Sequence, residues 1–352
     1  MQLLYLLNIL IFLLILNLPE SFSGCFHSKH KHTTDNAGAS SSRTHTEQGH
    51  ASGASSSHTH IGGPSNMCHC GQYERSYLIN INISTNNNSE IILESSQSPI
   101  GAGGYSEIFH VYWPFKNKCF ALKRYNNEFK QNKRNLKFAN NEIEVLEYFN
   151  TLNDNERNHI IKIQGSSIDN PPNNNNVLKY IVMDLAGMNL EEYYNNNFNE
   201  NDRELLIINI IKCAAKALEQ FHKHGIHLDI KATNFVLPYG KQSLELCILI
   251  DFSGSVITKD EYAERKEFTG TSIYEPPEYT NKMTDFHRSY DIYSFGVMIY
   301  KYLIHPNEFT EVNKELLGDG NLDKLAKDCM EENPDNRPNI NYIIRRLYLL
   351  NI

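Results

Sequence analysis

Two short segments of the chain carry the side chains that could do chemistry. The first is HLDIKATN, which contains Asp229, Lys231 and Asn234, and the second is DFS, which begins with Asp251. An acid, a lysine and two oxygen ligands suit transfer of a phosphoryl group, because the protein must position the attacking hydroxyl and neutralise charge on the phosphates. In this interpretation Asp229 accepts or orients the hydroxyl proton and Lys231 lies beside the transferred phosphate. Asn234 and Asp251 then hold magnesium ions.

The residues between these two segments predict a β-hairpin. Residues 235–237 and 246–250 are apolar and partly β-branched, and Pro238-Tyr239-Gly240 lies in the link between them. Such a hairpin returns Asp251 to the side of Asn234. The sequence therefore supplies a scaffold that brings the two segments together.

A glycine-rich segment and a strand lysine lie upstream. IGAGGYSEI at 100–108 stands between two strand-like runs, at 90–94 and 109–112. Its glycines would let the backbone approach phosphates, and the third glycine of the usual pattern is replaced by the small residue Ser106. The next predicted strand, CFALK, ends at Lys123.

A predicted helix offers an acidic partner for this lysine. The helix includes residues 141–146, with the sequence NEIEVL. Glu142 is the expected partner of Lys123. Glu144 is less favoured, since a residue two positions on lies on another face of the helix.

Three downstream segments complete an ordered set of motifs. GTSIYEPPE, ending at Glu278, resembles the end of an activation segment, and YDIYSFG at 290–296 resembles the start of a central helix. NPDNRP contains Arg337, which is expected to pair with Glu278. As a set, from about Tyr77 to Leu349, these motifs resemble the eukaryotic protein kinase family.

The resemblance implies an α+β fold with two lobes and ATP in the cleft between them. It implies a kinase domain over 76–350, with a small lobe of antiparallel strands and one helix at 76–183 and a mainly helical large lobe at 187–350. Lys231 is typical of the Ser/Thr type of catalytic loop. The residues 141–143, the hinge after Met183 and residues 234–235 are also similar to the dual-specificity spindle-checkpoint kinases.

The resemblance also implies a site for ATP and Mg²⁺. Lys123, paired with Glu142, would hold the α- and β-phosphates. Met183 falls at the gatekeeper position, and backbone groups of Asp184 and Ala186 would bond the adenine. The implied nucleotide contacts are Gly101, Gly103, Ser106, Ile108, Ala121, Lys123, Met183, Asp184, Ala186 and Val236.

Three positions depart from the family pattern. Ser106 and Ser253 each stand where the pattern has glycine, and Leu228 stands where many kinases have the arginine that receives an activation-loop phosphate. Activation by such a phosphate is therefore not expected. The alternative hypothesis is a pseudokinase that acts as a binding or scaffold module. The sequence does not identify a protein substrate.

The amino terminus predicts a secretory signal peptide over 1–23. Residues 3–18 form an apolar run that is too short to span a bilayer, and Pro19 and small residues follow, with cleavage expected near Ser23 or Gly24. A retained anchor is the alternative. Cleavage would leave no stable membrane anchor and would send the protein outside the cell or into the secretory lumen, or export it as an effector into another organism.

Residues 24–75 predict a disordered linker rich in Ser, Gly, Thr and His. Eight of the fifteen histidines fall there, at 27, 30, 32, 45, 50, 58, 60 and 69, close to Cys25, Cys68 and Cys70. Metal binding by this tail is the alternative to a solvated segment, but the irregular spacing does not imply a closed tetrahedral site.

The net charge and the positions of the cysteines argue against a nucleic-acid-binding protein and against a disulfide-rich protein. The net charge of −8 gives no basic footprint for nucleic acid. Cys119, Cys213, Cys247 and Cys329 occur singly in apolar or helical contexts. They are therefore expected as buried thiols and not as a disulfide framework.

Overall fold

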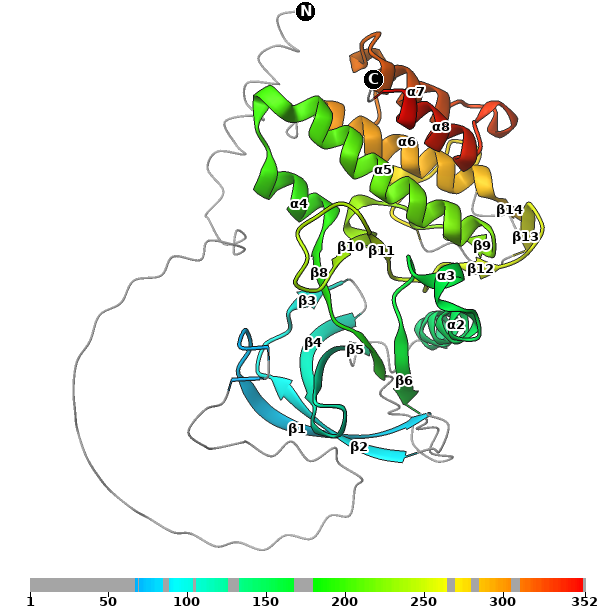
Figure 1. Cartoon of the computed structure of the whole chain (residues 1–352). Helices are drawn as coiled ribbons and strands as arrows, with labels where there is room; N and C mark the ends of the chain where they lie inside the picture. The colour runs from blue at the N-terminus through cyan, green and yellow to red at the C-terminus, as the bar shows by residue number, and fades with distance from the viewer. Residues whose placement is uncertain are drawn as a thin grey trace, which may run out of the picture. The chain divides into compact units, whose positions relative to one another are not determined.

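The small lobe is built on a curled antiparallel sheet beside one long helix. In this computed structural model the described residues are 67–350, except 69, 85–88, 104–105, 126–132, 168–179, 265–269, 280–284 and 305–310. Among them the strand order in this sheet is β2-β1-β6-β7-β5-β4-β3, and Figure 1 shows the strands below the helical lobe. The strands are β1 (Arg75–Ser84), β2 (Ser89–Ser96), β3 (Gly101–Ala102), β4 (Ser106–Trp113), β5 (Lys118–Tyr125), β6 (Ile163–Ser167) and β7 (Tyr180–Asp184).

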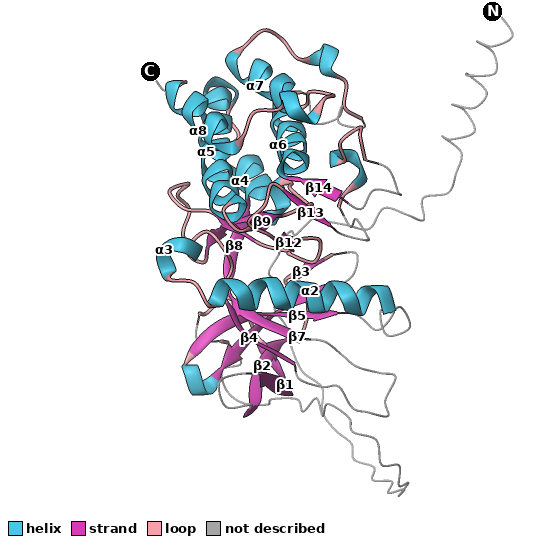
Figure 2. Cartoon of the chain, turned by 90° about the vertical axis from the view of Figure 1, so that its right-hand side faces the viewer, coloured by secondary structure: helices cyan, strands magenta, loops and turns pink. Residues whose placement is uncertain are grey.

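Alternation of side chains along β4 and β5 gives the sheet two different faces. On one face Phe109, Val111, Phe120 and Leu122 belong to a buried apolar cluster. Because successive side chains point to opposite faces, the neighbours of these residues, including Lys123, point the other way. That face lies toward α2 (Lys133–Asn150), which crosses the sheet in Figure 2. The small lobe thus presents a lysine where the two lobes meet.

The large lobe is mainly helical, and its core is formed by α5 and α6. The helices of the two lobes beyond α2 are α3 (Asp154–Arg157), α4 (Leu190–Asn197), α5 (Arg203–His222), α6 (Arg288–Leu303), α7 (Asn321–Cys329) and α8 (Ile340–Leu349). A Cβ added to Gly296 of α6 would lie 2.7 Å from the Cβ of Cys329, so glycine at this position permits close packing against α7. None of the helices in the described ranges is long and apolar enough to cross a membrane.

Short strands connect the helices near the junction of the lobes. They are β8 (Ala186–Asn189), β9 (Gly225–Ile226), β10 (Phe235–Pro238), β11 (Ile248–Leu249), β12 (Val256–Ile257), β13 (Tyr262–Glu264) and β14 (Asp285–His287). Phe235 of β10 pairs with Leu249 of β11 in antiparallel register, which is the predicted hairpin. The two-lobed α+β fold expected from the sequence is confirmed.

The first described residues form a tight turn ahead of β1. Met67 pairs with Glu74 in an antiparallel bridge, and the N–H of Cys68 donates to the carbonyl of Tyr73 at 2.8 Å. This part of the predicted linker is therefore structured, because Cys68 is buried against the small lobe. The predicted signal peptide and residues 24–66 of the linker lie outside the described residues, as do Cys25 and all eight of the linker's histidines.

One buried ion pair stabilises the large lobe. Arg337 donates through both terminal nitrogens to the carboxylate of Glu278, at 2.6 Å each. Its Nε donates to the carbonyl of Glu331 at 2.8 Å, and its guanidinium lies 5.0 Å from the ring centroid of Tyr293. The arginine side chain has no exposed surface, so it joins the activation segment to the carboxyl-terminal helices in the manner the sequence predicted.

We expect Arg337→Ala to lower the free energy of unfolding by about 3–5 kcal/mol, because it leaves a partly buried carboxylate and several carbonyls without their donor. Arg346→Ala is the matched control. Its pair with Asp328 is more exposed and should contribute no more than about 1 kcal/mol. Urea denaturation of both variants measures the difference. Equal losses would show that the buried pair contributes no more to the free energy of unfolding than the exposed pair.

Candidate active site

The ammonium group of Lys123 joins three elements at the junction of the lobes. Its Nζ lies 2.6 and 2.9 Å from the two carboxylate oxygens of Glu142 on α2, and 3.1 Å from Oδ1 of Asp251. Tyr125 also donates its hydroxyl to Glu142. Lys123 and Glu142 are buried, whereas 37% of the Asp251 side chain is exposed. The predicted Lys123–Glu142 pair is thus present, and Asp251 turns part of its carboxylate to the cleft.

The electrostatics of this group keep both Lys123 and Asp251 charged. Burial acts to lower the pKa of Lys123, but Asp251 and Glu142 outweigh it and the pKa is raised. Burial acts to raise the pKa of Asp251, but the adjacent Lys123 outweighs it and lowers the pKa to about 2. Burial raises the pKa of Glu142, and Lys123 offsets this only in part. A cation and an ionised carboxylate therefore face the cleft together.

The carboxylate of Asp229 is engaged on both oxygens. Oδ2 accepts from Nζ of Lys231 at 2.7 Å and from Nδ2 of Asn234 at 2.9 Å. Oδ1 accepts from the N–H and hydroxyl of Thr271, at 3.0 and 2.8 Å. Lys231 also donates to the Thr271 hydroxyl at 2.8 Å. The structure thus assembles the three residues predicted in the first segment and adds Thr271, which lay in the recognised GTSIYEPPE segment but was given no role.

A buried carboxylate of α6 holds the backbone before Asp229. Asp291 is fully buried and accepts from the N–H groups of His227 and Leu228, at 2.7 Å each, and from Nε2 of His222 at 2.9 Å. Leu228 has a φ of 66°, a left-handed conformation that is costly for a residue with a Cβ. The three bonds to Asp291 therefore oppose local strain.

The side chain of Leu228 lies in an apolar cluster. It is buried together with Ile226, Phe286 and Tyr290, and Val256 packs against them. An arginine at this position would place a guanidinium among apolar groups. The apolar surroundings thus suit leucine at position 228, where the family pattern has arginine.

The loop that begins at Asp251 fits a serine at its third position, Ser253. Among the described non-glycine residues only Asn117, Leu228 and Asp251 have positive φ, so Ser253 is free of the strain that would require glycine. Its hydroxyl lies 3.1 Å from Oδ1 of Asp251. Serine in place of glycine therefore causes no backbone strain in the observed conformation.

An amide on α2 holds the same loop from the small lobe. Nδ2 of Asn141 lies 3.1, 3.2 and 2.9 Å from the carbonyls of Phe252, Ser253 and Ser255. The ring of Phe252 meets His227 edge-on, with centroids 5.3 Å apart. The helix could be predicted from the sequence, but a role for Asn141 could not, because an amide next to a glutamate has no signature of its own.

The residues predicted to contact a nucleotide lie on or beside strands of the small lobe and the first strands of the large lobe. In β4 and β5, Ile108 pairs with Lys123, and in β5 and β7, Ala121 pairs with Met183. Gly101 is exposed at the start of β3, and Gly103 directly follows this strand. Ala186 is half-buried at the start of β8. Ser106 begins β4, Asp184 ends β7, and Val236 is buried in β10.

Three of these positions have backbone features that bear on the prediction. The N–H of Asp184 donates to the carbonyl of Lys162 at 2.9 Å, so of its backbone groups only the carbonyl could accept from a base. A Cβ added to Gly101 or Gly103 would meet no protein atom closer than 3.8 Å. A Cβ at either position would therefore make only ordinary van der Waals contact with the protein.

The two lobes and their arrangement are those of the protein kinase fold. The protein kinase domain model matches residues 95–349, and the chain belongs to the protein kinase family. The solved structure of the ROP18 kinase domain in complex with AMP-PNP and sucrose has a similar fold. It matches with a TM-score of 0.58 and 15% identity, over 76% of this chain and 81% of that one.

Two curated relatives carry kinase names. The serine/threonine-protein kinase mos of Patiria pectinifera is 28% identical over 163 residues, which is 44% of this chain and 44% of the relative. The interferon-induced, double-stranded RNA-activated protein kinase of Rattus norvegicus is 22% identical over 271 residues, 70% of this chain and 50% of the relative. The chain thus spans about half the length of these relatives or less.

We expect Asn141→Ala to loosen the loop at 251–255, because several carbonyls lose a common donor. A loss of about 1.4 kcal/mol would speed local amide hydrogen exchange about tenfold. Hydrogen–deuterium exchange with mass spectrometry measures this, and the neighbouring exposed Asn140→Ala is the matched control. Unchanged exchange in Asn141→Ala would show that the loop is held by other contacts.

Proposed function

We propose that this protein transfers the γ-phosphate of ATP to Ser or Thr hydroxyls of a protein substrate. The observation that carries the proposal is the Asp229 carboxylate, held between Lys231, Asn234 and Thr271 at distances of 2.7–3.0 Å. Membership of the protein kinase family and the serine/threonine kinase name of one relative support it.

Asp229 would act on the substrate hydroxyl. An aspartate beside the attacking oxygen can orient the hydroxyl and accept its proton as the bond to phosphorus forms. Lys231 lies 2.7 Å from this carboxylate and provides positive charge where the transferred group carries negative charge. Thr271 holds the opposite oxygen, so the carboxylate cannot rotate away without breaking several hydrogen bonds.

The donor set fits Mg²⁺ and ATP phosphates. Asn234 directs its amide nitrogen to Asp229, which leaves the amide oxygen as the ligand atom, and ionised Asp251 supplies carboxylate oxygen. Bound magnesium would neutralise phosphate charge. Lys123 would bind the α- and β-phosphates, and Glu142 holds its ammonium in place. Gly101 and Gly103 have no side chain, so phosphates could approach the backbone at these positions.

We expect Asp229→Asn to lower the rate of phosphoryl transfer by at least about 100-fold, because the amide cannot accept the proton. Asp260→Asn makes the same chemical change at an exposed position and should keep full activity. The measurement is transfer of labelled phosphate from Mg-ATP to a mixed peptide library, followed by phosphoamino acid analysis.

Phosphoserine and phosphothreonine in the product would support the proposed specificity, and phosphotyrosine alone would contradict it. Folded protein that binds Mg-ATP but transfers no phosphate to peptides or to itself would overturn the proposal. That result would favour the pseudokinase function.

We further propose that residues 1–23 are removed as a signal peptide and that the protein acts in the secretory lumen, outside the cell or as an exported effector. The apolar run before Pro19 supports this. In cells that express the full chain, secreted or luminal protein should begin near Gly24, as determined by amino-terminal sequencing. Uncleaved protein in the cytosol would contradict the proposal.

A further inference from the structure

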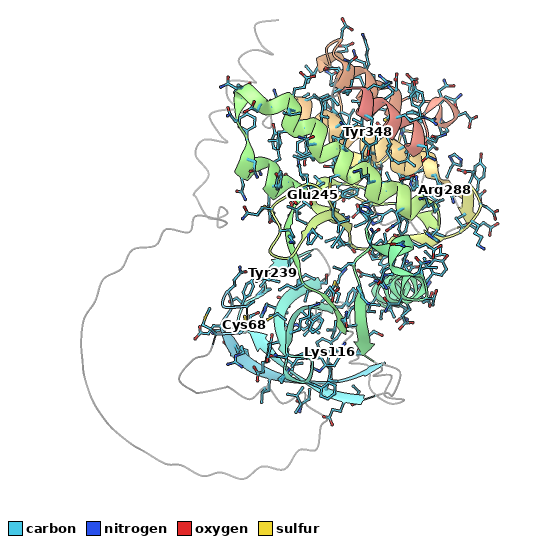
Figure 3. The ribbon with its side chains drawn as sticks, in the orientation of Figure 1. Cys68, Lys116, Tyr239, Glu245, Arg288 and Tyr348 are labelled. Atoms are coloured by element: carbon cyan, nitrogen blue, oxygen red, sulfur yellow. The ribbon has the colours of Figure 1, made fainter. Side chains whose placement is uncertain are left out.

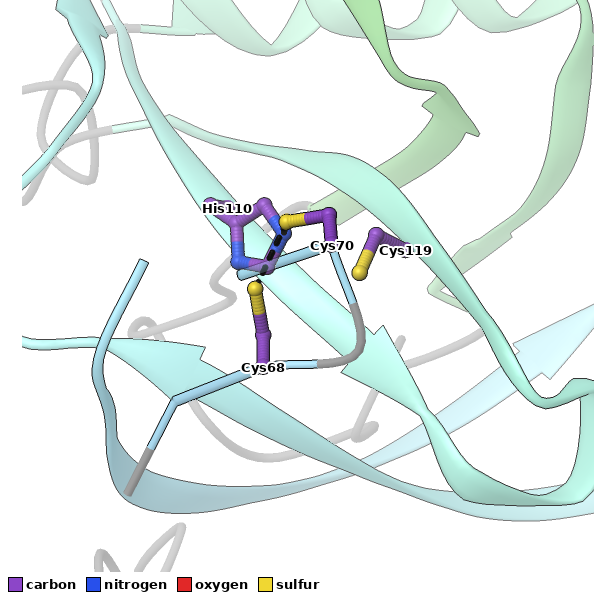
Figure 4. Close-up of side chains that lie close together, drawn as sticks. All are labelled: Cys68, Cys70, His110 and Cys119. Carbon is purple, nitrogen blue, oxygen red and sulfur yellow. Dashed lines mark hydrogen bonds between the residues drawn. The ribbon is translucent and has the colours of Figure 1, made fainter. Parts of the chain in front are cut away.

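Four sulfur- and nitrogen-bearing side chains meet on the small lobe, away from the catalytic residues. They are Cys68 and Cys70 from the turn before β1, His110 from β4 and Cys119 from β5. The ligand atom that each would offer lies within 4.8 Å of all the others. In Figure 4 the three sulfur atoms and the imidazole converge on one small volume. We propose that this cluster is a structural zinc site with three cysteine ligands and one histidine ligand.

The chemistry and geometry of the cluster match zinc. Three cysteines and one histidine are a common ligand set for closed, tetrahedral zinc sites. Zinc bonds of about 2.3 Å to sulfur and 2.0–2.1 Å to nitrogen imply a tetrahedral edge of about 3.6 Å between sulfur and nitrogen. Nε2 of His110 lies 3.5 Å from Sγ of Cys70. The Sγ atoms of Cys68 and Cys70 are 2.7 Å apart, so an ion would separate them by about 1 Å to the edge of about 3.8 Å between two sulfurs.

The β-sheet presents two of the ligands on one face. In the β4–β5 register His110 lies opposite Ala121, and Tyr112 lies opposite Cys119. Cys119 is thus two residues from Ala121 on the same strand face, which makes His110 and Cys119 diagonal neighbours. The two positions are determined by regular strand pairing and do not depend on a loop.

The turn before β1 supplies the other two ligands in a compact conformation. The N–H of Gly71 donates to the carbonyl of Cys68 at 2.9 Å, and Gly71 has a φ of 70°, which glycine adopts without strain. The turn brings Cys68 and Cys70 to the same side.

The imidazole of His110 has no other evident function. Its side chain is fully buried, and its Nδ1 has no hydrogen-bond partner among the described residues. Tyr73 stacks on the ring with centroids 4.3 Å apart and so fixes its orientation. Burial lowers the pKa of His110 to about 4, which keeps the imidazole in the neutral form that binds metals.

The surroundings act differently on two of the thiols, and burial raises the pKa of Cys119 to about 12. Burial acts to raise the pKa of Cys70, but hydrogen bonds from Cys68 and from the backbone of Gln72 outweigh it and lower the pKa. Tyr239 of the large lobe interacts with Cys70, and Figure 3 labels Tyr239 and Cys68 on the same side of the molecule. Zinc here would therefore fasten the amino-terminal turn to the small lobe beside the large lobe.

Binding is a ligand exchange without redox change. Each cysteine thiol loses its proton to solvent as its sulfur bonds to zinc, and neutral His110 binds through one ring nitrogen. All six described cysteines are free, including the three in the cluster. A disulfide between Cys68 and Cys70 would be the competing state, and it would remove two ligands.

The test uses the full chain without a histidine tag, dialysed against a weak chelator that clears loosely held metal from the histidine-rich segment. We expect about one zinc ion per chain by mass spectrometry of the metal content, and Co²⁺ in its place should give a thiolate-to-cobalt charge-transfer band and the spectrum of a tetrahedral site. Cys68→Ala and Cys119→Ala should each lose the ion and the band. Cys213→Ala, a buried cysteine of α5, should retain both.

Folding is monitored separately, so that loss of metal is not confused with loss of structure. Cys68 precedes the sheet, and Cys68→Ala should remain folded. A strong chelator should lower the thermal midpoint of the unsubstituted chain but not that of Cys68→Ala. The proposal is overturned if the unsubstituted chain retains no zinc, if Cys68→Ala retains as much as the unsubstituted chain, or if intact mass shows a disulfide between Cys68 and Cys70.

Discussion

The relative positions of the sheet, helix α2 and the loop that begins at Asp251 depend on the ion pairs of the buried Lys123 ammonium. Removing such a charge from water costs several kcal/mol, and only well-placed carboxylates offset that cost. Glu142 and Asp251 provide them from opposite sides, at 2.6 and 3.1 Å. If α2 or the loop moved away, Lys123 would lose one of the two carboxylates that offset the cost of burying its charge. The three elements therefore form one cooperative unit, and Asn141 reinforces it through the backbone of the same loop.

The large lobe has a corresponding anchor in Asp291. Its buried carboxylate compensates for the left-handed backbone at Leu228 by accepting two adjacent N–H groups. A left-handed residue costs roughly 1–2 kcal/mol, which is within the range that two hydrogen bonds to a charged group can offset. Because Leu228 itself lies in an apolar cluster, the position of the loop that carries Asp229 is determined from within α6. No charged group at position 228 is needed for it.

Residues that act through local motifs could be predicted from the sequence, and residues that act through distant contacts could not. Asp229, Lys231 and Asn234 lie within six residues of one another, so their spacing alone indicated a common site, and the hairpin at 235–250 correctly returned Asp251 to them. The ring of His222 bonds to Asp291, which is 69 residues away, so local spacing could not indicate this pair. Thr271 and Asn141 were missed for the same reason. Hydroxyl and amide groups have functions only where the fold places an acceptor or donor against them.

The cysteine and histidine cluster illustrates how such a site depends on strand register. Spacing among the amino-terminal residues gave no closed set of ligands, because His110 and Cys119 come from later strands. Their juxtaposition is set by the tight connection at Pro114–Asn117, where Asn117 has a φ of 48° and its N–H donates to the carbonyl of Pro114. A shift of one residue in this register would turn the side chain of Cys119 to the opposite face. The same shift would turn Lys123 away from Glu142, since residues 119 and 123 share a strand face. A single turn therefore aligns both the lysine of the catalytic cleft and the ligands of the proposed zinc site.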